Sequence, residues 1–466
     1  MRKEILLLLT LGCFIHVSLA QQPPISRCNA NNINATILGD GSCFLPQETD
    51  AWGNYPCSTW EVPAGSSKQT IFQHTLWFGG LDANDSLHLA AYRFGQIGQD
   101  YWQGPLKTTD ASIDLMTMLK YHHVWSLTRA EIDDFIAHHS ESSYKVPHDI
   151  MTWPAHGEDG YAQNLAPFVD VDGDGHYNPE AGDYPDIKGD LCLFFIFNDS
   201  FAEHTESYGS KLGLEVHAMV YAYNAPDDEA LYNTVFVNYQ LFNRSVNNYH
   251  DAYLGLWTDW DIGDGWDDYV GCDVQRSSCF AYNGNPNYDA IYEDNPPLQA
   301  LTVLAGPHTD DNERLGMTGF IFHGNGSGVN GDPSVAEDYY NYLRGLWMNG
   351  QPMLYGGNAY DSGTLNLPCK FMFPGDSDPD NIGTNGIQPE GYGTNGVYWT
   401  EEQCNNSPSD RRGLASVGPF SLPAGGMQEL DYANITVWKN ESLTVMERKG
   451  EFIDHIRTLF NNGLTK

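Results

Sequence analysis

Apolar and polar residues alternate along several long runs of this sequence, and the alternation predicts β-strands. Six such runs, rich in Phe, Val, Tyr and Leu, lie at residues 191–198, 212–223, 232–243, 251–259, 413–420 and 428–438. β-Branched and aromatic residues favour strands, and the short polar breaks between the runs suit turns between antiparallel neighbours. We therefore expect a mainly β fold, an antiparallel β-sandwich that carries Asp-rich loops and long surface loops over residues 166–440.

The chain before this sandwich differs in composition. Residues 21–65 are polar and rich in Asn, Pro and Gly, so we expect an irregular lead-in there. Residues 69–78 and 87–92 alternate and predict two strands, separated by a turn that starts at Gly79. We interpret residues 21–165 as an N-terminal, cysteine-containing β module with a small helical insert.

Helices are expected at three places. Thr128 stands three residues before Glu131, which is the spacing of a capping box, and the helix that it starts should end at the histidine pair 138–139. A short helix is expected within residues 333–348, a region otherwise dominated by loops. Apolar residues within residues 441–466 fall on one stripe and predict a C-terminal helix.

An acidic loop at residues 170–190 is the most distinctive stretch of the chain. Its alternating Asp residues, followed by Gly175, match the first half of a calcium-binding loop. Calcium takes about six to eight oxygen ligands, and alternating Asp around a glycine turn directs short side chains to one point. The ligands predicted for this site are Asp170, Asp172, Asp174, the carbonyl of His176, Asn178 and Asp183.

The match to an EF-hand is incomplete. Ala181 stands at the twelfth position, where an EF-hand has a bidentate Glu, and Pro179 and Pro185 exclude flanking helices. Asp186 and Asp190 are alternatives to Asp183 for closing the ligand shell. The competing interpretation is a solvated acidic turn that binds no metal.

Carboxylates gather a second time at residues 259–273, where a predicted strand ends. Alternation along the strand places Asp259 and Asp261 on one face, and Gly263 and Gly265 allow the following loop to curl. The ligands predicted for a second calcium site are Asp259, Asp261, Asp264 and Asp268, with Asp267 as an alternative.

Two enzymatic interpretations compete with calcium binding. A glycoside hydrolase needs two carboxylates about 5 to 10 Å apart, which the 259–273 cluster can supply, with Trp257, Trp260 and Trp266 as stacking platforms for sugars. The other interpretation is a metalloenzyme. Two His–Glu pairs occur in which the members are two residues apart, so each pair would lie on one face of a strand and could supply metal ligands. These residues are His204, Glu206, Glu215 and His217. The competing interpretation is that these are polar residues on the solvent-facing side of an edge strand, which would give the same pattern without a metal.

Six histidines in the helical region invite a further metal interpretation. They are His122, His123, His138, His139, His148 and His156. Because the pairs are adjacent in sequence, neighbouring rings on a helix point away from each other. We expect them to be surface histidines.

The start of the chain predicts export. Arg2 and Lys3 precede an apolar run at residues 5–15, and small residues lead to a cleavage site after Ala20. A lipoprotein anchor at Cys13 is the alternative. We therefore expect a secreted protein or one on the outer cell surface.

Composition narrows the classes of partner. The formal charge is -38, from 23 basic and 61 acidic residues, which argues against nucleic acid and anionic membranes as partners. No later stretch reaches the ~20 apolar residues of a membrane span. The chain also contains 27 Tyr, 21 Phe and 12 Trp, enough apolar surface to form a folded core.

Cysteine usage favours disulfides in an exported chain. The sequence has nine cysteines, and cleavage after Ala20 removes one of them. Local pairs are expected, and sequence alone leaves the full pairing open. The expected pairs are two among Cys28, Cys43 and Cys57, then Cys272 with Cys279, and Cys369 with Cys404.

Several stretches resemble a known family. They include Leu165-Ala-Pro-Phe-Val-Asp-Val-Asp-Gly-Asp-Gly-His-Tyr-Asn-Pro, Asp267-Asp-Tyr-Val-Gly-Cys-Asp and Phe373-Pro-Gly-Asp-Ser-Asp-Pro. Together they are similar to the large exported proteins of Bacteroidota, many of which carry a type IX secretion sorting domain. The resemblance implies export across the outer membrane and a calcium-loaded, β-rich ectodomain, and it brings no enzymatic activity. The sorting domain itself is not recognised in this sequence.

These patterns together predict a secreted or cell-surface calcium-binding protein with a structural or adhesive role. Its partner would be a glycan or a surface protein, bound by large loops on a rigid sheet. A carbohydrate-active hydrolase that uses carboxylates of residues 259–273 is the alternative.

Overall fold

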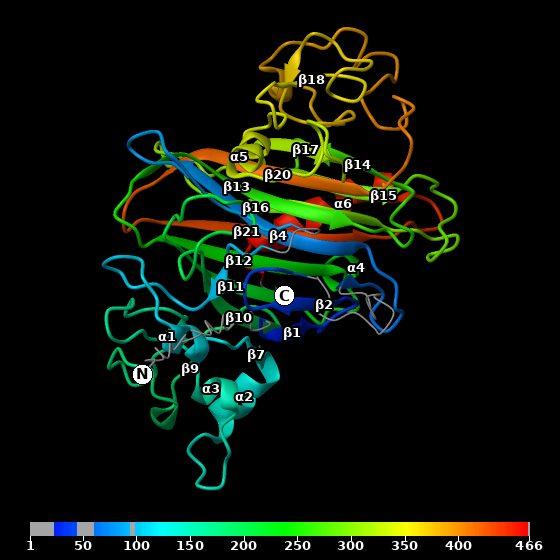
Figure 1. The fold of residues 1–466 in the computed structure, drawn as a ribbon. Coiled ribbons are helices and arrows are strands. Elements are labelled where there is room, and N and C mark those ends of the chain that lie inside the picture. The colour runs from blue at the N-terminus through cyan, green and yellow to red at the C-terminus, as the bar shows by residue number, and fades with distance from the viewer. Residues whose placement is uncertain (1–22, 44–59, 94–97, 465–466) are drawn as a thin grey trace, which may run out of the picture.

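A computed structural model describes residues 23–43, 60–93 and 98–464. The described chain forms two large antiparallel sheets with helices and loops on their outer sides (Figure 1). The expected mainly β, sandwich-like fold is therefore confirmed. The export signal, Cys13 and Cys57 lie outside the described residues.

The smaller of the two large sheets has five strands. In spatial order they are β17 (Gly319–His323), β20 (Arg411–Leu422), β13 (Tyr249–Trp260), β4 (Ile71–Leu81) and β5 (Leu87–Ala90). Leu256 on β13 faces Leu76 on one side and Ala415 on the other. Strands from either side of the boundary expected near residue 165 therefore pair within one sheet.

The larger sheet has nine strands. Eight follow one another in the order β14 (Asp268–Asp273), β15 (Ser278–Asn283), β16 (Leu298–Ala305), β21 (Met427–Val437), β12 (Thr234–Asn243), β11 (Leu214–Ala222), β10 (Leu191–Asn198) and β6 (Trp102–Gln103). The ninth, β7 (Trp125–Thr128), also pairs with β10. β10 has the same bounds as the strand predicted at residues 191–198, so that prediction is confirmed.

The lead-in at residues 21–65 is more regular than expected. It contains β1 (Ile25–Cys28), β2 (Asn34–Leu38) and β3 (Trp60–Glu61), which form a small antiparallel sheet. Ile33, Ala35 and Ile37 are buried, so apolar residues at every second position bury one face of this segment. Polar neighbours obscure that short pattern in the sequence. Two-stranded sheets also form between β8 (Phe168–Val169) and β9 (Tyr184–Pro185), and between β18 (Met353–Leu354) and β19 (Pro368–Cys369).

The helices lie outside the two sheets. They are α1 (Leu115–Lys120), α2 (Arg129–His138), α3 (His148–Met151), α4 (Glu229–Tyr232), α5 (Ala336–Leu343) and α6 (Val445–Asn461), with 3-10 turns η1 (Pro179–Ala181) and η2 (Ile382–Thr384). The capping box of Thr128 and Glu131 is formed as predicted. Among the described residues, no helix has the length and apolarity that crossing a membrane requires.

Apolar and polar contacts hold the two sheets together. Phe195 and Val216 of the larger sheet and Leu254 of the smaller one belong to one buried cluster. His74 also reaches across the interface, where its Nε2 lies 2.9 Å from the hydroxyl of Tyr432. The main core therefore lies between the sheets.

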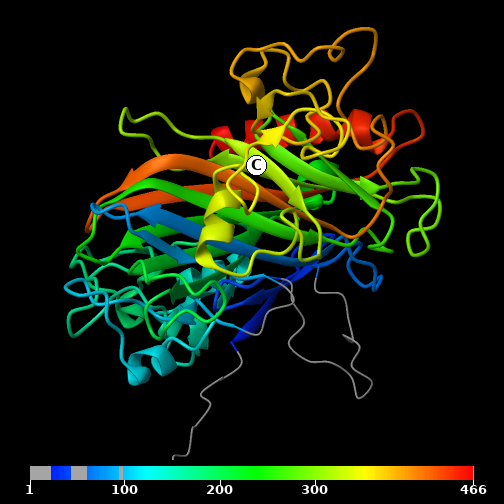
Figure 2. The same ribbon diagram turned by 45° about the horizontal axis from the view of Figure 1, so that its top comes forward.

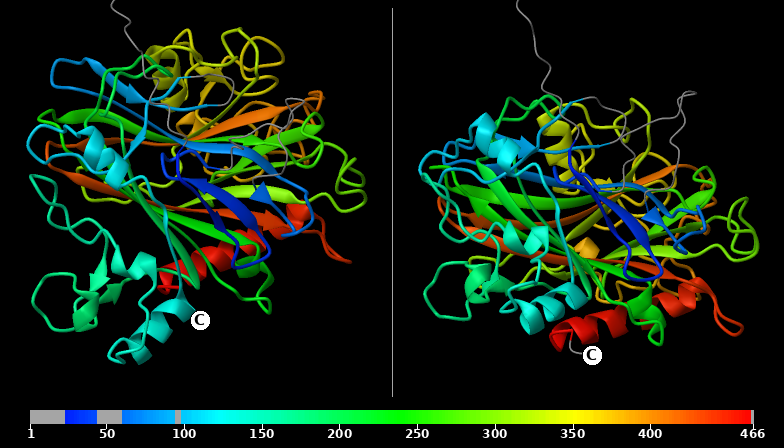
Figure 3. Two further views of the ribbon diagram at one scale, coloured as in Figure 1. Left: turned by 60° about the horizontal axis from the view of Figure 1, so that its bottom comes forward. Right: turned by 90° about the horizontal axis from the view of Figure 1, so that it is seen from below.

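Each sheet is covered on its outer side. On the larger sheet, Ile453 and Ile456 of α6 pack with Ile435 in a second buried cluster, and Figure 3 shows α6 lying along that sheet. On the smaller sheet, Tyr339 of α5 packs edge-on against Trp77, with ring centroids 4.7 Å apart. The loop-rich region, residues 324–410, contains α5 and lies with it on the outer side of the smaller sheet (Figure 2).

The expected disulfides are not formed among the described cysteines. The seven cysteines in the described ranges all have free thiols. Cys272 and Cys279 face each other across β14 and β15, but the Cys272 thiol turns to the carbonyl oxygen of Met372, 3.2 Å away. Burial raises the pKa of Cys272, Cys279 and Cys369. These thiols therefore behave as apolar core groups, and the pairings proposed for Cys272 with Cys279 and Cys369 with Cys404 are wrong.

Candidate metal centres

Seven carboxylates gather where β13 ends and the chain turns toward β14. This acidic cluster consists of Asp259, Asp261, Asp264, Asp267, Asp268, Asp289 and Asp410. Oxygen atoms of Asp259, Asp261 and Asp410 lie within 4.8 Å of one another. The four ligands that the sequence predicts here therefore share one neighbourhood, joined by two residues from distant parts of the chain.

Two glycines and Asp289 shape the loop around these carboxylates. Gly263 has a φ of +70°, and any Cβ on Gly263 or Gly265 would collide with the carboxylate of Asp289 or Asp261. Asp289 is fully buried and accepts hydrogen bonds from the backbone N–H groups of Asp264 at 3.1 Å and Ile291 at 2.8 Å. The loop after β13 is thus wrapped onto the loop after β15.

Several oxygens of the cluster are buried without a hydrogen-bond donor. Asp268 is fully buried; its Oδ2 accepts the N–H of Ile262 at 2.9 Å, whereas its Oδ1 has no hydrogen-bond partner. Oδ1 of Asp267 and of Asp410 are in the same situation. Buried polar atoms are nearly always paired, and an unpaired one costs about 1–3 kcal/mol or more if charged. A ligand that carries positive charge would satisfy these oxygens.

The electrostatics of the cluster lead to the same conclusion. Burial raises the pKa of Asp259 and Asp268 far above the usual range, and neighbouring carboxylates add to the effect. Burial and Asp410 raise the pKa of Asp261 to about 7. Arg412 offsets part of this repulsion, since its Nε lies 3.3 Å from Asp259 Oδ2. A divalent cation would stabilise the ionised form of the remaining carboxylates.

The acidic loop between β8 and β9 brings together three of its predicted ligands. Carboxylate oxygens of Asp170, Asp172 and Asp174 lie within 4.8 Å of one another. Asp170 accepts the N–H groups of Gly173 at 2.7 Å and Gly175 at 2.8 Å, and these bonds lower its pKa. Asp172 and Asp174 are exposed.

The other predicted ligands of this loop have structural partners. Asp183 is buried and accepts the N–H groups of Val171 and Asn178, each at 2.8 Å. Asn178 caps η1 by accepting the N–H of Glu180 at 3.1 Å. His176 donates its N–H to Asp174 Oδ1 at 2.7 Å. Asp183 and Asn178 therefore brace the loop, and the three alternating carboxylates are the donors that converge.

The two predicted pairs do not assemble a metal site: Glu215 and His217 lie on β11, whereas His204 and Glu206 lie in the loop before it and not on a strand. His204 directs Nδ1 at the carbonyl oxygen of Leu89, 2.8 Å away, and Nε2 at that of Asp199, 2.7 Å away. Both ring nitrogens are therefore engaged by backbone carbonyl oxygens and not directed at a shared metal position. Glu215 accepts from His217 at 2.7 Å and Arg244 at 2.6 Å. In the described ranges, no group of convergent ligands includes His204 or His217.

The tryptophans near the acidic cluster differ in exposure. Trp257 and Trp260 are fully buried in the core, so neither can stack on a sugar, contrary to the expectation. Trp266, in the loop after β13, is 69% exposed. Tyr288 and Ile291, which flank Asp289, are also exposed.

Comparison with known proteins assigns no family. No protein-family model matches the sequence, and no curated protein matches it. The function of the acidic cluster therefore has to be inferred from its own geometry and chemistry.

Proposed function

We propose that this chain is an exported or cell-surface protein that binds calcium at the acidic cluster and has a structural or adhesive role. The observation that carries the proposal is the buried Oδ1 of Asp268, which has no hydrogen-bond donor and lies among carboxylates that repel one another. A bound cation would satisfy this oxygen and remove the repulsion at once.

The donor atoms favour calcium over other metals. The acidic cluster offers carboxylate oxygens and neither imidazole nor thiolate, and hard oxygen donors suit calcium or magnesium. The donors come from strand ends and from separate loops, and calcium accepts such irregular shells more readily than magnesium, which demands near-octahedral geometry. The formal charge of -38 adds a general preference for divalent cations.

A second calcium ion is assigned to Asp170, Asp172 and Asp174. This site is more exposed than the acidic cluster, and backbone N–H groups already stabilise its carboxylates. We expect it to bind more weakly. Its role is to hold the loop between β8 and β9 in shape.

The proposed ligand-binding surface surrounds the acidic cluster. Trp266, Tyr288 and Ile291 are 69%, 57% and 44% exposed, and they stand on the two loops that the Asp289 carboxylate ties together. Exposed aromatic residues on ordered loops are typical of contacts with glycans and proteins. Calcium would order this surface and so control binding. The hydrolase alternative has less support, because Asp259 is engaged by Arg412 and two of its three tryptophans are buried.

Calcium titration of the metal-free chain by calorimetry tests the proposal. The wild type should bind at two classes of site. Asp268→Asn should abolish the tighter class, and the double variant Asp172→Asn, Asp174→Asn should abolish the weaker one. Identical isotherms for the wild type and Asp268→Asn would overturn the assignment of the acidic cluster.

Export is the remaining part of the proposal. It is supported by the charged and apolar start of the chain and by the resemblance to exported Bacteroidota proteins. Expression of the full chain followed by mass spectrometry of the mature N-terminus tests it. A protein that begins at Gln21 and leaves the cytoplasm is expected, and retention of residues 1–20 would contradict export by this signal.

A further inference from the structure

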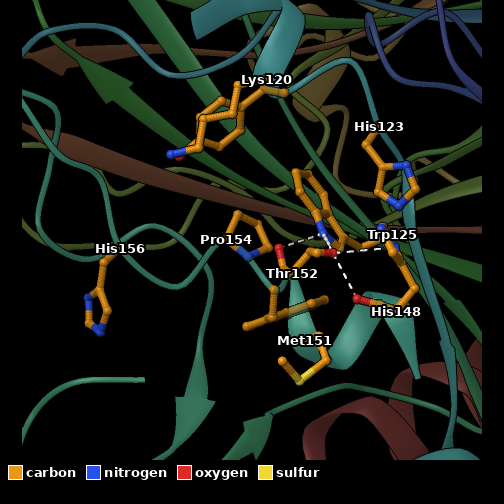
Figure 4. A pocket seen from close by; sticks show the side chains of 10 residues that line it. Lys120, His123, Trp125, His148, Met151, Thr152, Pro154 and His156 are labelled. Atoms are coloured by element: carbon orange, nitrogen blue, oxygen red, sulfur yellow. Dashed lines mark hydrogen bonds between the residues drawn. The ribbon is translucent and has the colours of Figure 1, made fainter. Parts of the chain in front are cut away.

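A cavity of about 530 Å³ lies on the helical side of the larger sheet, far in sequence from the acidic cluster. Residues that line it include Lys120, Tyr121, His123, Trp125, His148 and Thr152. Figure 4 shows His123 and His148 near Trp125 on one side of the cavity, with Lys120 and His156 farther away. None of the sites discussed above uses these residues.

Two histidines and one aspartate converge at the rim of this cavity. His123 Nε2 lies 2.9 Å from Asp149 Oδ1, and His148 Nδ1 lies 3.1 Å from the same oxygen. The two rings meet edge to face with centroids 5.8 Å apart. Each of the three residues offers one donor atom, and these atoms all lie within 4.8 Å of one another.

The surrounding fold fixes two of the three side chains. Asp149 Oδ2 accepts the N–H of Ser126 at 2.7 Å, which ties the start of α3 to β7. The ring of Trp125 packs edge-on against His123 at 5.0 Å, and its Nε1 donates to the carbonyl oxygen of Thr152 at 2.9 Å. Asp149 and His123 are thus oriented by contacts that do not use their convergent atoms.

We propose that His123, His148 and Asp149 bind a zinc ion, with the fourth coordination position open to the cavity for a water molecule or an anion. Two imidazoles and one carboxylate are donors that suit zinc, and zinc sites that keep one position open for water or substrate typically have three protein ligands. Donor atoms about 2.0–2.1 Å from a tetrahedral zinc lie about 3.3 Å apart. The observed separations of 2.9 and 3.1 Å need only a small expansion.

Access and chemistry distinguish this site from the two acidic ones. The side chain of His148 is 76% exposed and that of His123 is 39% exposed, so a metal can enter from solvent. Nitrogen donors also favour zinc over calcium, which prefers oxygen alone. The site should therefore remain selective for zinc when calcium is abundant.

Two other histidines nearby provide contrasts. His156 contacts the carbonyl oxygen of Gln163 at 2.8 Å and the N–H of Tyr177 at 2.9 Å, so both of its nitrogens have partners. His138 lies 3.1 Å from Asp134 as an exposed pair on α2, and no convergent group of three ligands within the described part of the chain includes it. His138→Ala is therefore a matched control, since it removes an exposed histidine beside a carboxylate but no proposed ligand.

Zinc binding to the full chain tests the proposal. The metal-free protein is titrated with zinc chloride in excess calcium, so that the carboxylate sites are occupied, and zinc is counted by elemental analysis after dialysis. One zinc per chain is expected for the wild type and for His138→Ala. Even outer partners of metal ligands change affinity by about 10- to 100-fold, so His123→Ala and His148→Ala should each weaken binding at least tenfold.

Cobalt gives an independent readout. Substitution of Co²⁺ at the same site should produce a visible absorption band of a four-coordinate complex in the wild type and not in His148→Ala. Because His148 is mostly exposed, its replacement should leave the melting temperature in chelator unchanged, which separates ligand loss from unfolding. Absence of zinc binding to the wild type, or equal zinc affinity in His148→Ala and wild type, would overturn the proposal.

Discussion

The carboxylate of Asp289 accepts a hydrogen bond from the backbone N–H of Asp264 at 3.1 Å and so ties the loop after β15 to the loop after β13. The bond brings two acidic residues, 25 positions apart, into one neighbourhood. Burial and mutual repulsion then disfavour the ionised carboxylates of Asp261, Asp267 and Asp268. A bound cation would stabilise the ionised form of such an arrangement at neutral pH.

Replacement of Asp268 should have opposite effects with and without calcium. Asp268→Asn keeps an oxygen for the N–H of Ile262 but cannot take on the negative charge that a bound cation would stabilise. In chelator the variant should therefore be at least as stable as the wild type. In calcium at about 100 times the dissociation constant, it should lack roughly 2.7 kcal/mol of the stabilisation that binding supplies. Urea unfolding in both buffers measures the two differences.

Glu401→Gln is the control for this experiment. Glu401 is also a fully buried carboxylate, but Arg411 pairs with both of its oxygens, at 3.0 and 2.9 Å. Breaking a buried ion pair costs about 3–5 kcal/mol, and this loss should be equal in calcium and in chelator. Asp268→Asn behaving in the same way would show that Asp268 is only a structural residue.

Two buried histidines should make the protein sensitive to acid. Burial lowers the pKa of His74 to about 3 and that of His323 to about 4, whereas an unfolded histidine has a pKa of about 6.5. The unfolded chain therefore binds more protons below pH 6.5. The stability that these groups contribute is complete above that pH and falls by about 1.4 kcal/mol per group per pH unit as the pH decreases toward the folded-state values.

His74→Asn isolates one of these contributions. The variant loses contacts with Thr258 and Tyr432 and should be less stable than the wild type at pH 7. Its stability should nevertheless fall less steeply between pH 6.5 and 4.5 when both proteins are unfolded in urea. The carboxylates titrate in both proteins, so the difference in slope reports His74, and equal slopes would contradict its being neutral in the core.

Trp266 should matter for binding and not for folding. Its side chain is 69% exposed, so Trp266→Ala should change the free energy of unfolding by no more than about 0.5 kcal/mol. Binding to an immobilised glycan array in calcium should decrease. Val246→Ala is the control, because Val246 is 79% exposed and precedes the opposite end of β13. Equal loss of binding in both variants would contradict a ligand surface at Trp266.

The free thiols lead to a simple chemical test. Alkylation of the denatured protein without reductant should label Cys272, Cys279, Cys369 and Cys404, and mass spectrometry of the peptides identifies each site. The melting temperature should also be unaffected by dithiothreitol. A Cys272–Cys279 crosslinked peptide would show that these facing residues are oxidised in the mature protein.

Local patterns were sufficient for many of the elements. The run at residues 191–198 predicts β10, and the capping box of Thr128 and Glu131 predicts α2, because alternation and capping act between residues a few positions apart. Residues 268–273 form β14 although their Asp and Gly residues are typical of a loop. There, pairing with β15 outweighs intrinsic propensity.

The candidate sites were predictable only in part, because some of their residues are close in sequence and others are brought together only by the fold. Asp259, Asp261 and Asp268 are close in sequence, so their clustering follows from one strand and one loop. Asp289 and Asp410 come from other loops, and only the folded chain brings them to the cluster. His123 lies in the loop before β7 and His148 begins α3, so their positions in the sequence give no sign that the two rings meet.

Thermal unfolding of the metal-free full chain with calcium and with chelator tests the central proposal most directly. If calcium binds the folded acidic cluster, the melting temperature should rise steadily with the logarithm of the calcium concentration, and magnesium at equal concentration should raise it less. Elemental analysis of the purified protein should find calcium. An identical melting temperature in calcium and in chelator would contradict a calcium site at Asp268 and its neighbours.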